Sequence, residues 1–312
     1  MAKIAGIDIG GTKISGAIIE NGIIQDDIII EKTPFCTKDI LETAFSIIEK
    51  LKTNNDICAI AIATAGAVNN ENSKVIGSTG NLPQDYPTTE FQKVFSEKFN
   101  VPTLIENDAN AAAFAEFKIG AAKGSLHSIT VTLGTGVGGG IIINGKLLKG
   151  KSGAAGEIGH IILGIEENRP CTCGQLNCFE AYASGTGFRK TIQELSLKLP
   201  EFKTSVLGNK NTEELTTYDV IANYKSGDNF CKIAYETWER HILIGLISLA
   251  NIFDSDNIVI SGGLASEVNY EKLEKLINEK IVTTPIKLLQ AKSGNYAGMI
   301  GAALLAEEKF NL

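Results

Sequence analysis

The order of hydrophobic and polar positions predicts that the chain begins with strands. Three apolar runs of strand length lie within the first thirty residues, at 4–9, 14–19 and 23–30. Asn21-Gly22, between the second and third runs, is the signal of a two-residue hairpin turn. Residues 39–52 then carry apolar side chains at helical spacing, and 57–63 has the pattern of a buried strand. Together these elements predict an α/β unit.

Beyond a loop-rich stretch at 64–90, strands and helices continue to alternate. The apolar pattern predicts further strands at 101–105, 127–133, 139–143, 257–260 and 286–289. It predicts helices at about 88–99, 109–117, 186–198, 217–225, 229–253 and 270–280, and a last helix from about 295. We therefore expect an α/β fold throughout the chain.

The second half repeats a feature of the first. In both halves a glycine-threonine turn, around Thr12 and around Thr135, separates two predicted strands, and a hairpin signal follows. This similarity predicts two related domains. We place their boundary in the small-residue stretch at 119–124, so that residues 1–120 form the N-terminal domain and 121–294 the larger C-terminal domain.

Composition narrows the class of protein. The 312 residues suffice for two domains, and 44% hydrophobic and 21% charged residues are ordinary for a folded protein. No apolar run reaches the roughly 18 residues of a membrane helix, and the chain start lacks the pattern of a secretory signal, so we expect a cytoplasmic protein. The net charge of −7 argues against binding a nucleic-acid backbone, although it leaves room for a local nucleotide site.

Two glycine-rich matches fail in their context. Residues 145–152 fit the P-loop pattern, but Gly145 belongs to a predicted hairpin and the following residues are too rich in glycine to begin a helix. Residues 134–139 fit GxGxxG, yet a strand follows where a dinucleotide-binding fingerprint requires a helix.

Three glycine turns, one of them within residues 134–139, stand at strand ends and suit a nucleotide. In the first, Asp8 is followed by Gly10, Gly11, Thr12 and Lys13. Backbone amides in such a turn hold phosphate oxygens, and the carboxylate can hold hydrated Mg²⁺. The second turn consists of Gly134, Thr135 and Gly136, and the third of Gly262 and Gly263. The alternative for the first turn is a plain hairpin with a surface Asp and Lys; three such turns together favour a nucleotide site.

A carboxylate and an amide meet where a strand precedes a helix, at Asn107-Asp108. One interpretation is ordinary helix capping, for which both residue types are preferred. The other makes Asp108 a general base, which the helix N-terminus keeps ionised.

The cysteines divide into a cluster and three scattered residues, Cys36, Cys58 and Cys231. The cluster consists of Cys171, Cys173 and Cys178, eleven to eighteen residues after His160. Three thiolates and one imidazole form the ligand set of a structural zinc ion, and Gly174 and Asn177 tolerate the left-handed backbone of a metal-binding turn. The alternative is three reduced cysteines in a loop, for which this polar segment is a poor setting.

Two carboxylates flank the predicted zinc segment. Glu157 precedes His160 by three residues, and Glu180 follows Cys178 by two. If zinc holds the segment, these carboxylates and one imidazole nitrogen converge and suit a polyhydroxylated ligand. The alternative is a pair of solvated surface glutamates.

These motifs, in this order, resemble the ROK family of sugar kinases and repressors. The matching segments are 8–13, 106–110, 133–140, 156–160, the cysteine segment up to Glu180, 183–185 and 261–263. The resemblance implies the two-domain actin-like ATPase fold, of ribonuclease-H-like topology, with a cleft between the domains. It also implies that the C-terminal helix, about 295–312, packs back on the N-terminal domain.

The resemblance assigns roles to the matching positions. Asp108 would accept the proton of a sugar hydroxyl. The sugar would be held by Asn107, Glu157, His160 and Glu180, with Gly66 and Thr79 lining the site. Mg-ATP would be surrounded by the three glycine turns, namely Asp8, Gly10, Gly11, Thr12, Lys13, Gly134, Thr135, Gly136, Gly262 and Gly263. Zinc would be bound by His160, Cys171, Cys173 and Cys178. One residue departs from the family pattern, because Asn177 stands where a glycine is usual.

Among ROK activities we expect an ATP-dependent kinase that phosphorylates the 6-hydroxyl of glucose. Segment 150–157, Ala67 and Asn81-Leu82-Pro83 resemble the glucokinase branch. N-acetylmannosamine or N-acetylglucosamine kinase is the alternative. A repressor would need a DNA-binding segment before Asp8, for which there is no room, and intact Asp8 and Asp108 argue against a sugar sensor without activity. By resemblance, a homodimer or homotetramer is expected.

Overall fold

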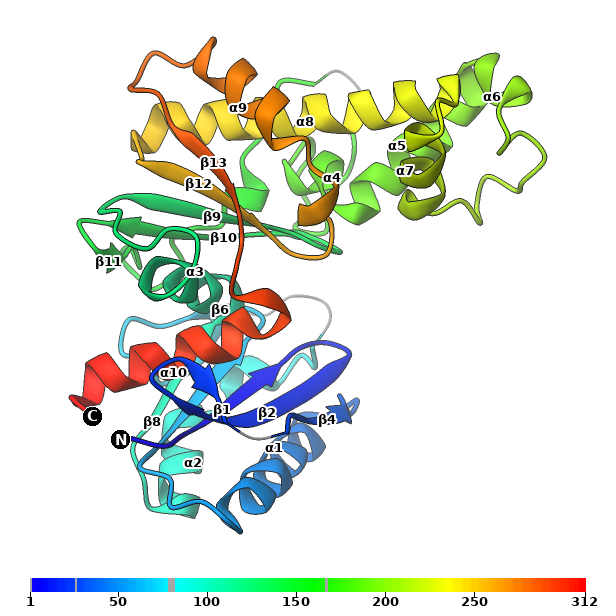
Figure 1. Ribbon diagram of the computed structural model, residues 1–312. Coiled ribbons are helices and arrows are strands. Elements are labelled where there is room, and N and C mark those ends of the chain that lie inside the picture. Colours follow the sequence, from blue (N-terminus) through cyan, green and yellow to red (C-terminus); the bar gives the residue numbers. More distant parts are fainter. Residues whose placement is uncertain (1, 26, 78–81, 166–167) are drawn as a thin grey trace. The chain divides into compact units, whose positions relative to one another are not determined.

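The structure, a computed structural model, describes residues 2–25, 27–77, 82–165 and 168–312 and comprises two compact units (Figure 1). Unit 1 consists of Met1–Thr130, Gly139–Gly156 and Ala291–Leu312, and unit 2 of Val131–Gly138 and Glu157–Gln290. Residues 121–130 and 139–156, which we expected in the C-terminal domain, thus group with unit 1. Hydrogen bonds explain this, since Ala122 N–H donates to Glu116 and Asn70 donates to the carbonyl of Gly150. The division into functional domains stays a prediction.

Unit 1 contains a mixed sheet in the order β3-β2-β1-β5-β8. Strands β1 (Ile4–Ile9) and β2 (Lys13–Glu20) form the expected antiparallel hairpin, while β5 (Ala59–Thr64) and β8 (Thr103–Asn107) run parallel to β1. The single strand predicted at 23–30 is wrong. It is replaced by β3 (Ile23–Ile24) and β4 (Ile29–Lys32), because β3 pairs with the end of β2 and β4 with its beginning.

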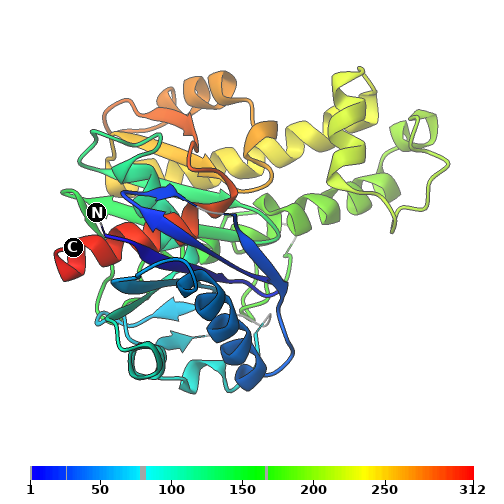
Figure 2. The same ribbon diagram turned by 60° about the horizontal axis from the view of Figure 1, so that its bottom comes forward.

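Helices cover both faces of this sheet (Figures 1 and 2). Amphipathic α1 (Thr37–Lys52) and phenylalanine-rich α2 (Phe91–Phe99) pack with isoleucines of the sheet in one core. Alanine-rich α3 (Asp108–Lys118) and α10 (Ala297–Phe310) form a second core with the other face. Small side chains allow α10 to pack closely on α3, beside the start of α3 at Asp108.

Short elements connect these layers. A small two-stranded sheet consists of β6 (Ala67–Val68) and β7 (Val75–Gly77). The helix expected at about 88–99 begins at Phe91, since a 3-10 turn, η1 (Tyr86–Thr88), with Pro87 precedes it. Another 3-10 turn, η4 (Gly294–Tyr296), leads into α10.

The second sheet has the order β11-β10-β9-β12-β13. Its strands are β9 (Ser128–Leu133), β10 (Val137–Ile143), β11 (Lys146–Leu147), β12 (Asn257–Ser261) and β13 (Lys287–Gln290). The unit boundaries pass through β9 and β10. Both lie where the sequence predicts strands separated by the glycine turn at 134–136.

Unit 2 is mainly helical around α8 (Asn229–Phe253). The other helices are α4 (Glu180–Ala183), α5 (Gly185–Lys198), α6 (Glu201–Thr204), α7 (Thr217–Lys225) and α9 (Tyr270–Asn278), with 3-10 turns η2 (Ile158–His160) and η3 (Ala265–Glu267). Buried Trp238 of α8 stacks on Phe188 at 4.7 Å between ring centroids and donates to the carbonyl of Ala183. This contact anchors α4 and α5, which begin directly after the cysteine segment.

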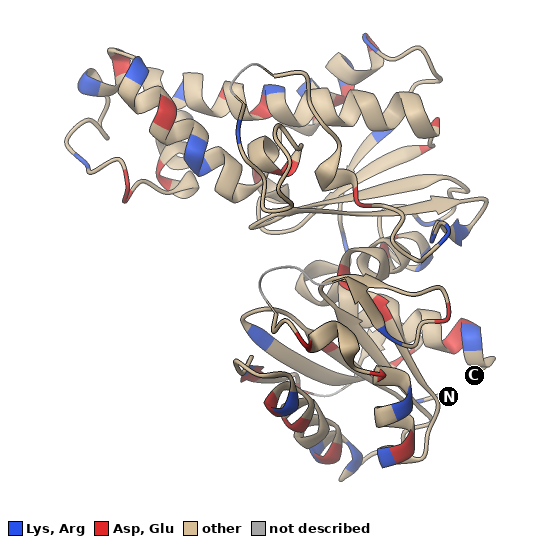
Figure 3. Ribbon diagram, turned by 180° about the vertical axis from the view of Figure 1, so that it is seen from behind, with Lys and Arg blue, Asp and Glu red and all other residues tan. Residues whose placement is uncertain are grey.

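Charged residues lie mainly on helices and loops, whereas the strands carry few (Figure 3). This distribution follows from strands that are buried on both faces. Among the described residues, no helix combines the length and the apolar character needed to cross a bilayer.

Candidate functional site

In unit 1, the first glycine turn links β1 to β2. The N–H of Gly10 donates to the carbonyl of Lys13 at 3.0 Å, which closes the turn. Thr33 supports it from the side, since its hydroxyl donates to the Gly10 carbonyl at 2.6 Å and its N–H to the Thr12 carbonyl at 3.1 Å. Gly11, Thr12 and Lys13 are exposed. The turn is therefore held rigidly while its tip faces outward.

Asp8 and Asp108 lie close together in unit 1. A Cβ added to Gly298 of α10 would lie 3.8 Å from Asp8 Oδ2 and 3.5 Å from the Asp108 carbonyl oxygen. Burial, and next the charge of Asp108, raise the pKa of Asp8 to about 7, although Lys13 acts in the opposite direction. Two neighbouring carboxylates of which one resists ionisation suit a divalent cation, which would relieve their repulsion. These residues therefore fit Mg²⁺.

At the junction of β8 and α3, helix capping and the candidate catalytic carboxylate belong to two different residues. Asn107 is the N-cap, and its Oδ1 accepts the N–H of Asn110 at 3.0 Å. Asp108 is the first helical residue, is exposed, and its Oδ1 accepts the N–H of Ala109 at 2.8 Å. The helix dipole favours a negative charge in the first turn, and exposure leaves this carboxylate accessible to a hydroxyl group. The capping interpretation thus applies to Asn107 and does not exclude Asp108 as a base.

Gly66 lies against Asn107. Its carbonyl accepts the Asn107 Nδ2–H at 3.0 Å, which orients the amide. Its backbone has φ +96°, and a Cβ there would collide with the carbonyl oxygen of Gly77. Only glycine fits this position without strain. Thr79, expected to line the same site, lies outside the described residues.

In unit 2, the other two glycine turns meet beside the start of α5. Gly185, the first residue of α5, donates its N–H to the carbonyl of Gly134 at 2.8 Å, and the Thr186 hydroxyl donates to the Thr135 carbonyl at 2.9 Å. The 262–263 turn follows β12, where the N–H of Leu264 donates to the Leu133 carbonyl at 3.1 Å. The structure thus brings 134–136 and 262–263 together near a helix N-terminus, an arrangement that suits phosphate.

Glu180 connects the cysteine segment to the 134–136 turn. Its Oε2 accepts the N–H of Val137 at 3.0 Å, while its Oε1 accepts the Thr172 hydroxyl at 3.2 Å. Glu157 is exposed, and its Oε2 lies 3.9 Å from Nε2 of His160. The structure therefore brings Glu157 and His160 together, and gives Glu180 partners on both of its oxygens.

The four predicted zinc ligands converge. Their ligand atoms lie within 4.8 Å of one another, with Cys171 Sγ 3.6 Å from His160 Nδ1 and Cys173 Sγ 3.6 Å from Cys178 Sγ. Zn–S bonds of about 2.3 Å and Zn–N bonds of about 2.0 Å at tetrahedral angles require separations of roughly 3.6–3.8 Å. The residues therefore fit zinc. His160 directs Nδ1 to this centre, which leaves Nε2 on the side of Glu157.

Backbone and burial around the zinc set agree with this fit. Gly174 has φ +86° and Asn177 φ +61°, which confirms the left-handed backbone expected at both positions. Asn177 thus replaces the usual glycine without disturbing the turn. Burial raises the pKa of the Cys178 thiol to about 12, so a thiolate at this position needs a cation beside it.

The structure confirms that neither glycine match has the strand-to-helix context that its motif requires. Gly145 lies in the turn between β10 and β11 with φ +73°, and the residues at 153–156 do not form a helix. Strand β10 follows the 134–136 turn directly. In both cases the element that follows the glycines is not a helix, as the sequence already indicated.

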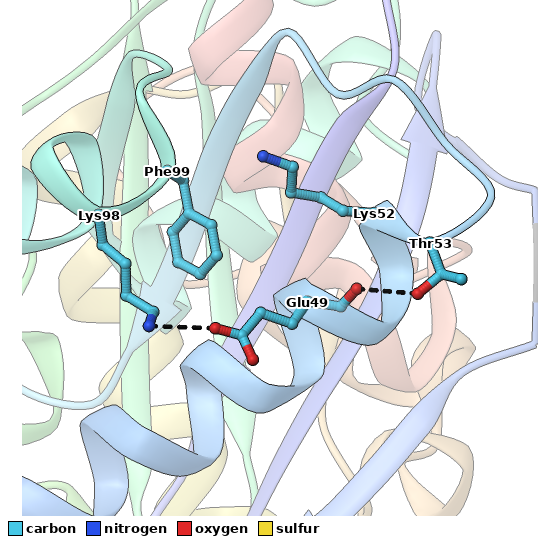
Figure 4. A pocket seen from close by; sticks show the side chains of 5 residues that line it. All are labelled: Glu49, Lys52, Thr53, Lys98 and Phe99. Carbon is cyan, nitrogen blue, oxygen red and sulfur yellow. Dashed lines mark hydrogen bonds and ion pairs between the residues drawn. The ribbon is translucent and has the colours of Figure 1, made fainter.

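A surface pocket of about 350 Å³ lies elsewhere on unit 1, between the C-terminal ends of α1 and α2 (Figure 4). Its lining is Glu49, Lys52, Thr53, Lys98 and Phe99. Glu49 already pairs with Lys98 at 3.0 Å and accepts the Thr53 hydroxyl through its backbone carbonyl. None of the candidate site residues lines this pocket.

Sequence analysis missed two residues that support the site. Thr33 holds the first glycine turn, and Glu106, 1% exposed, lies beside Asn107 with Lys149 as its partner. The local signals for Glu106 are its position after Leu104 and Ile105 in a buried strand and its place in the matching segment 106–110, in which it has no assigned role. A buried carboxylate requires a donor from elsewhere in the chain, and the sequence does not indicate which one.

Comparisons with known proteins agree on one family. A model of the ROK family matches residues 4–309. The glucokinase of Streptomyces coelicolor is 32% identical over 316 residues, which cover 99% of this chain and 98% of the relative. The N-acetylmannosamine kinase of Vibrio cholerae is 34% identical over 312 residues, covering 97% and 98%.

A solved structure shows the same relationship in three dimensions. The ROK glucokinase of Streptomyces griseus, in complex with glucose and AMPPNP, superimposes with a TM-score of 0.83 at 29% identity and covers 98% of this chain and 100% of its own. Fold, family model and relatives therefore lead to one conclusion. This chain belongs to the ROK family and is a sugar kinase with the two-domain actin-like ATPase fold.

Proposed function

We propose that this kinase is a glucokinase, which transfers the γ-phosphoryl group of ATP to the 6-hydroxyl of glucose. The observation that carries the chemistry is the exposed carboxylate of Asp108 at the start of α3, next to Asp8. Glucose is supported by the glucokinases among the relatives and by the resemblance of segment 150–157 to that branch.

In this proposal Asp108 accepts the proton of the attacking hydroxyl. Phosphoryl transfer depends mainly on positioning and charge stabilisation, so a fixed base beside the hydroxyl is the main contribution of unit 1. The Asn107 amide donates one hydrogen bond to Gly66 and accepts one from Asn110. With its remaining N–H and oxygen lone pair it binds a sugar hydroxyl. Glu157, Nε2 of His160, Glu180 and Thr79 bind the remaining sugar hydroxyls.

The three glycine turns are the proposed ATP-binding residues. In unit 1, Asp8, Gly10, Gly11, Thr12 and Lys13 face the phosphates. In unit 2, Gly134, Thr135, Gly136, Gly262 and Gly263 do so, beside the N-terminus of α5. Mg²⁺, when bound near Asp8, supplies neutralisation of phosphate charge. His160, Cys171, Cys173 and Cys178 would hold zinc, which would fix the segment that carries His160 and leads to Glu180.

The deciding experiment is a coupled ADP-release assay over glucose, mannose, N-acetylglucosamine and N-acetylmannosamine, with 6-deoxyglucose as a matched sugar that lacks the acceptor hydroxyl. We expect the highest kcat/KM with glucose, and inhibition without turnover by 6-deoxyglucose. Turnover of 6-deoxyglucose would place the transfer at another hydroxyl. Absence of turnover with every sugar of the panel would contradict the proposed glucokinase activity.

A second candidate is N-acetylmannosamine kinase, favoured by the 34% identity to the Vibrio cholerae enzyme. The same assay separates the two, because a preference for the acetylated sugar reverses the order of kcat/KM. A homodimer or homotetramer is also proposed, and the mass of the protein in solution tests it.

A further inference from the structure

Glu106 is a buried carboxylate directly before the Asn107-Asp108 pair. Its Oε1 accepts the backbone N–H of Asn107 at 2.9 Å and Nδ2 of Asn110 at 3.2 Å. Its Oε2 accepts Nδ2 of Asn72 at 2.7 Å. With 1% of Glu106 exposed, these donors replace water around the charge. The backbone of Asn107 is therefore held by this carboxylate.

Lys149 supplies the countercharge. Its Nζ lies 2.8 Å from Glu106 Oε2 and also donates to the carbonyl of Asn69 at 3.2 Å. The Lys149 side chain is 18% exposed, so the ion pair is largely shielded from water. Removal of either partner would leave the other charge buried and unpaired.

Lys149 also begins the segment that leads to Glu157. Asn70 Nδ2 donates to the carbonyls of Gly150 at 3.2 Å and Lys151 at 2.9 Å. Gly153 lies so close to the strand residue Val68 that a Cβ would collide with its carbonyl oxygen. Residues 149–156 are thus packed firmly on β6 and the turn after it, and the ion pair ties this segment to β8.

We propose that Glu106 and Lys149 are positioning residues for phosphoryl transfer, an inference that rests on the proposed function. Glu106 fixes the Asn107 backbone, and Asn107 in turn is fixed through Gly66 and Asn110, so that Asp108 starts α3 in one orientation. Lys149 completes this arrangement by keeping the Glu106 carboxylate in place. A displacement of a reacting group by about 1 Å can cost on the order of 10²-fold in rate.

Lys149→Met tests the proposal in the full-length protein with ATP and the best sugar of the panel. We expect kcat to fall about 10- to 100-fold, with KM for ATP within about twofold of the wild type. Lys149→Arg, which keeps the charge, is expected to recover kcat to within about fivefold. Lys151→Met is the matched control, because Lys151 lies in the same segment with an exposed side chain, and it should keep wild-type kinetics.

The double variant Glu106→Gln/Lys149→Met separates positioning from stability. It has no unpaired buried charge, so we expect a thermal midpoint above that of Lys149→Met but a kcat that remains low. If Lys149→Met does not fold, the kcat of the double variant tests the positioning role instead. A folded double variant with wild-type kcat and sugar KM would overturn the proposal. A wild-type protein without turnover on any sugar would instead contradict the proposed function, so the two failures are distinguishable.

Discussion

Glu180 Oε2 accepts the backbone N–H of Val137 at 3.0 Å, across 43 positions of the sequence. The same carboxylate accepts the Thr172 hydroxyl through Oε1. One side chain therefore joins the cysteine segment, whose residues we propose bind zinc, to the glycine turn that we propose binds phosphate. A change at Glu180 should consequently affect both substrates.

Glu180→Gln keeps the size of the side chain but replaces one acceptor oxygen with a donor NH₂. We expect KM for the sugar and KM for ATP each to rise about tenfold, since a hydrogen bond to a charged group contributes about 1.5–3 kcal/mol. Steady-state kinetics with each substrate varied in turn measures this. Glu214→Gln, at an exposed position, is the control. An unchanged KM for ATP would show that Glu180 does not hold the turn.

Asp108→Asn should remove the base while preserving the start of α3. Asparagine is nearly isosteric and Asn107 still caps the helix, so sugar binding is expected to persist. Turnover should fall about 10²- to 10⁴-fold, the usual contribution of a general base. Single-turnover kinetics and calorimetric sugar titration measure the two effects. Asp56→Asn, at an exposed position, serves as control, and retained turnover in Asp108→Asn would exclude the base role.

The pKa of Asp8 predicts a pH dependence of stability in buffer free of Mg²⁺. The folded protein holds the Asp8 proton with a pKa of about 7, whereas the ordinary pKa of 3.8 applies to the unfolded chain. The contribution of this proton to stability is therefore complete below about pH 4 and is lost as the pH rises to about 7. Thermal midpoints of wild type and Asp8→Asn from pH 5 to 8 should differ increasingly, with the variant the more stable at pH 8. Parallel curves would contradict this expectation.

Zinc binding can be tested without an activity assay. We expect about one zinc ion per chain by elemental analysis, from the four-ligand set of a structural site. Cys178→Ser should lose most of the metal and lower the thermal midpoint, because the buried position then lacks a thiolate. Cys36→Ser, at an exposed cysteine outside the cluster, should keep both values. Equal zinc contents in the two variants would argue against this site.

Gly66→Ala should destabilise unit 1 more than the same change at another left-handed glycine. Gly66 has φ +96° and no room for a Cβ beside the Gly77 carbonyl, whereas Gly124 has φ +92° and open space around it. Backbone strain alone costs roughly 1–2 kcal/mol, which is the loss expected for Gly124→Ala. For Gly66→Ala we expect at least about 3 kcal/mol, measured by denaturant unfolding, since the collision adds to the strain. Equal losses at the two positions would show that the collision is relieved at no cost.

Elements with a long regular pattern were predicted closely. Helices α7 and α8 begin and end at the residues that their apolar spacing indicates, 217–225 and 229–253. The strand predicted at 23–30 was wrong, because an apolar run does not show which partner strand each part will meet. The boundary of such an element depends on pairing, whereas helix periodicity is a property of the segment itself.

The sequence by itself indicated the longer helices and strands, the turn glycines and the spacing of His160, Cys171, Cys173 and Cys178, because these depend on residue types at short spacings. Only the tertiary structure decided which groups donate hydrogen bonds to the carboxylates of Glu106 and Glu180. Each accepts hydrogen bonds from a partner 43 positions away, Lys149 and Val137. Local preferences act over a few residues, whereas the environment of a buried charge depends on which distant donors packing brings to it.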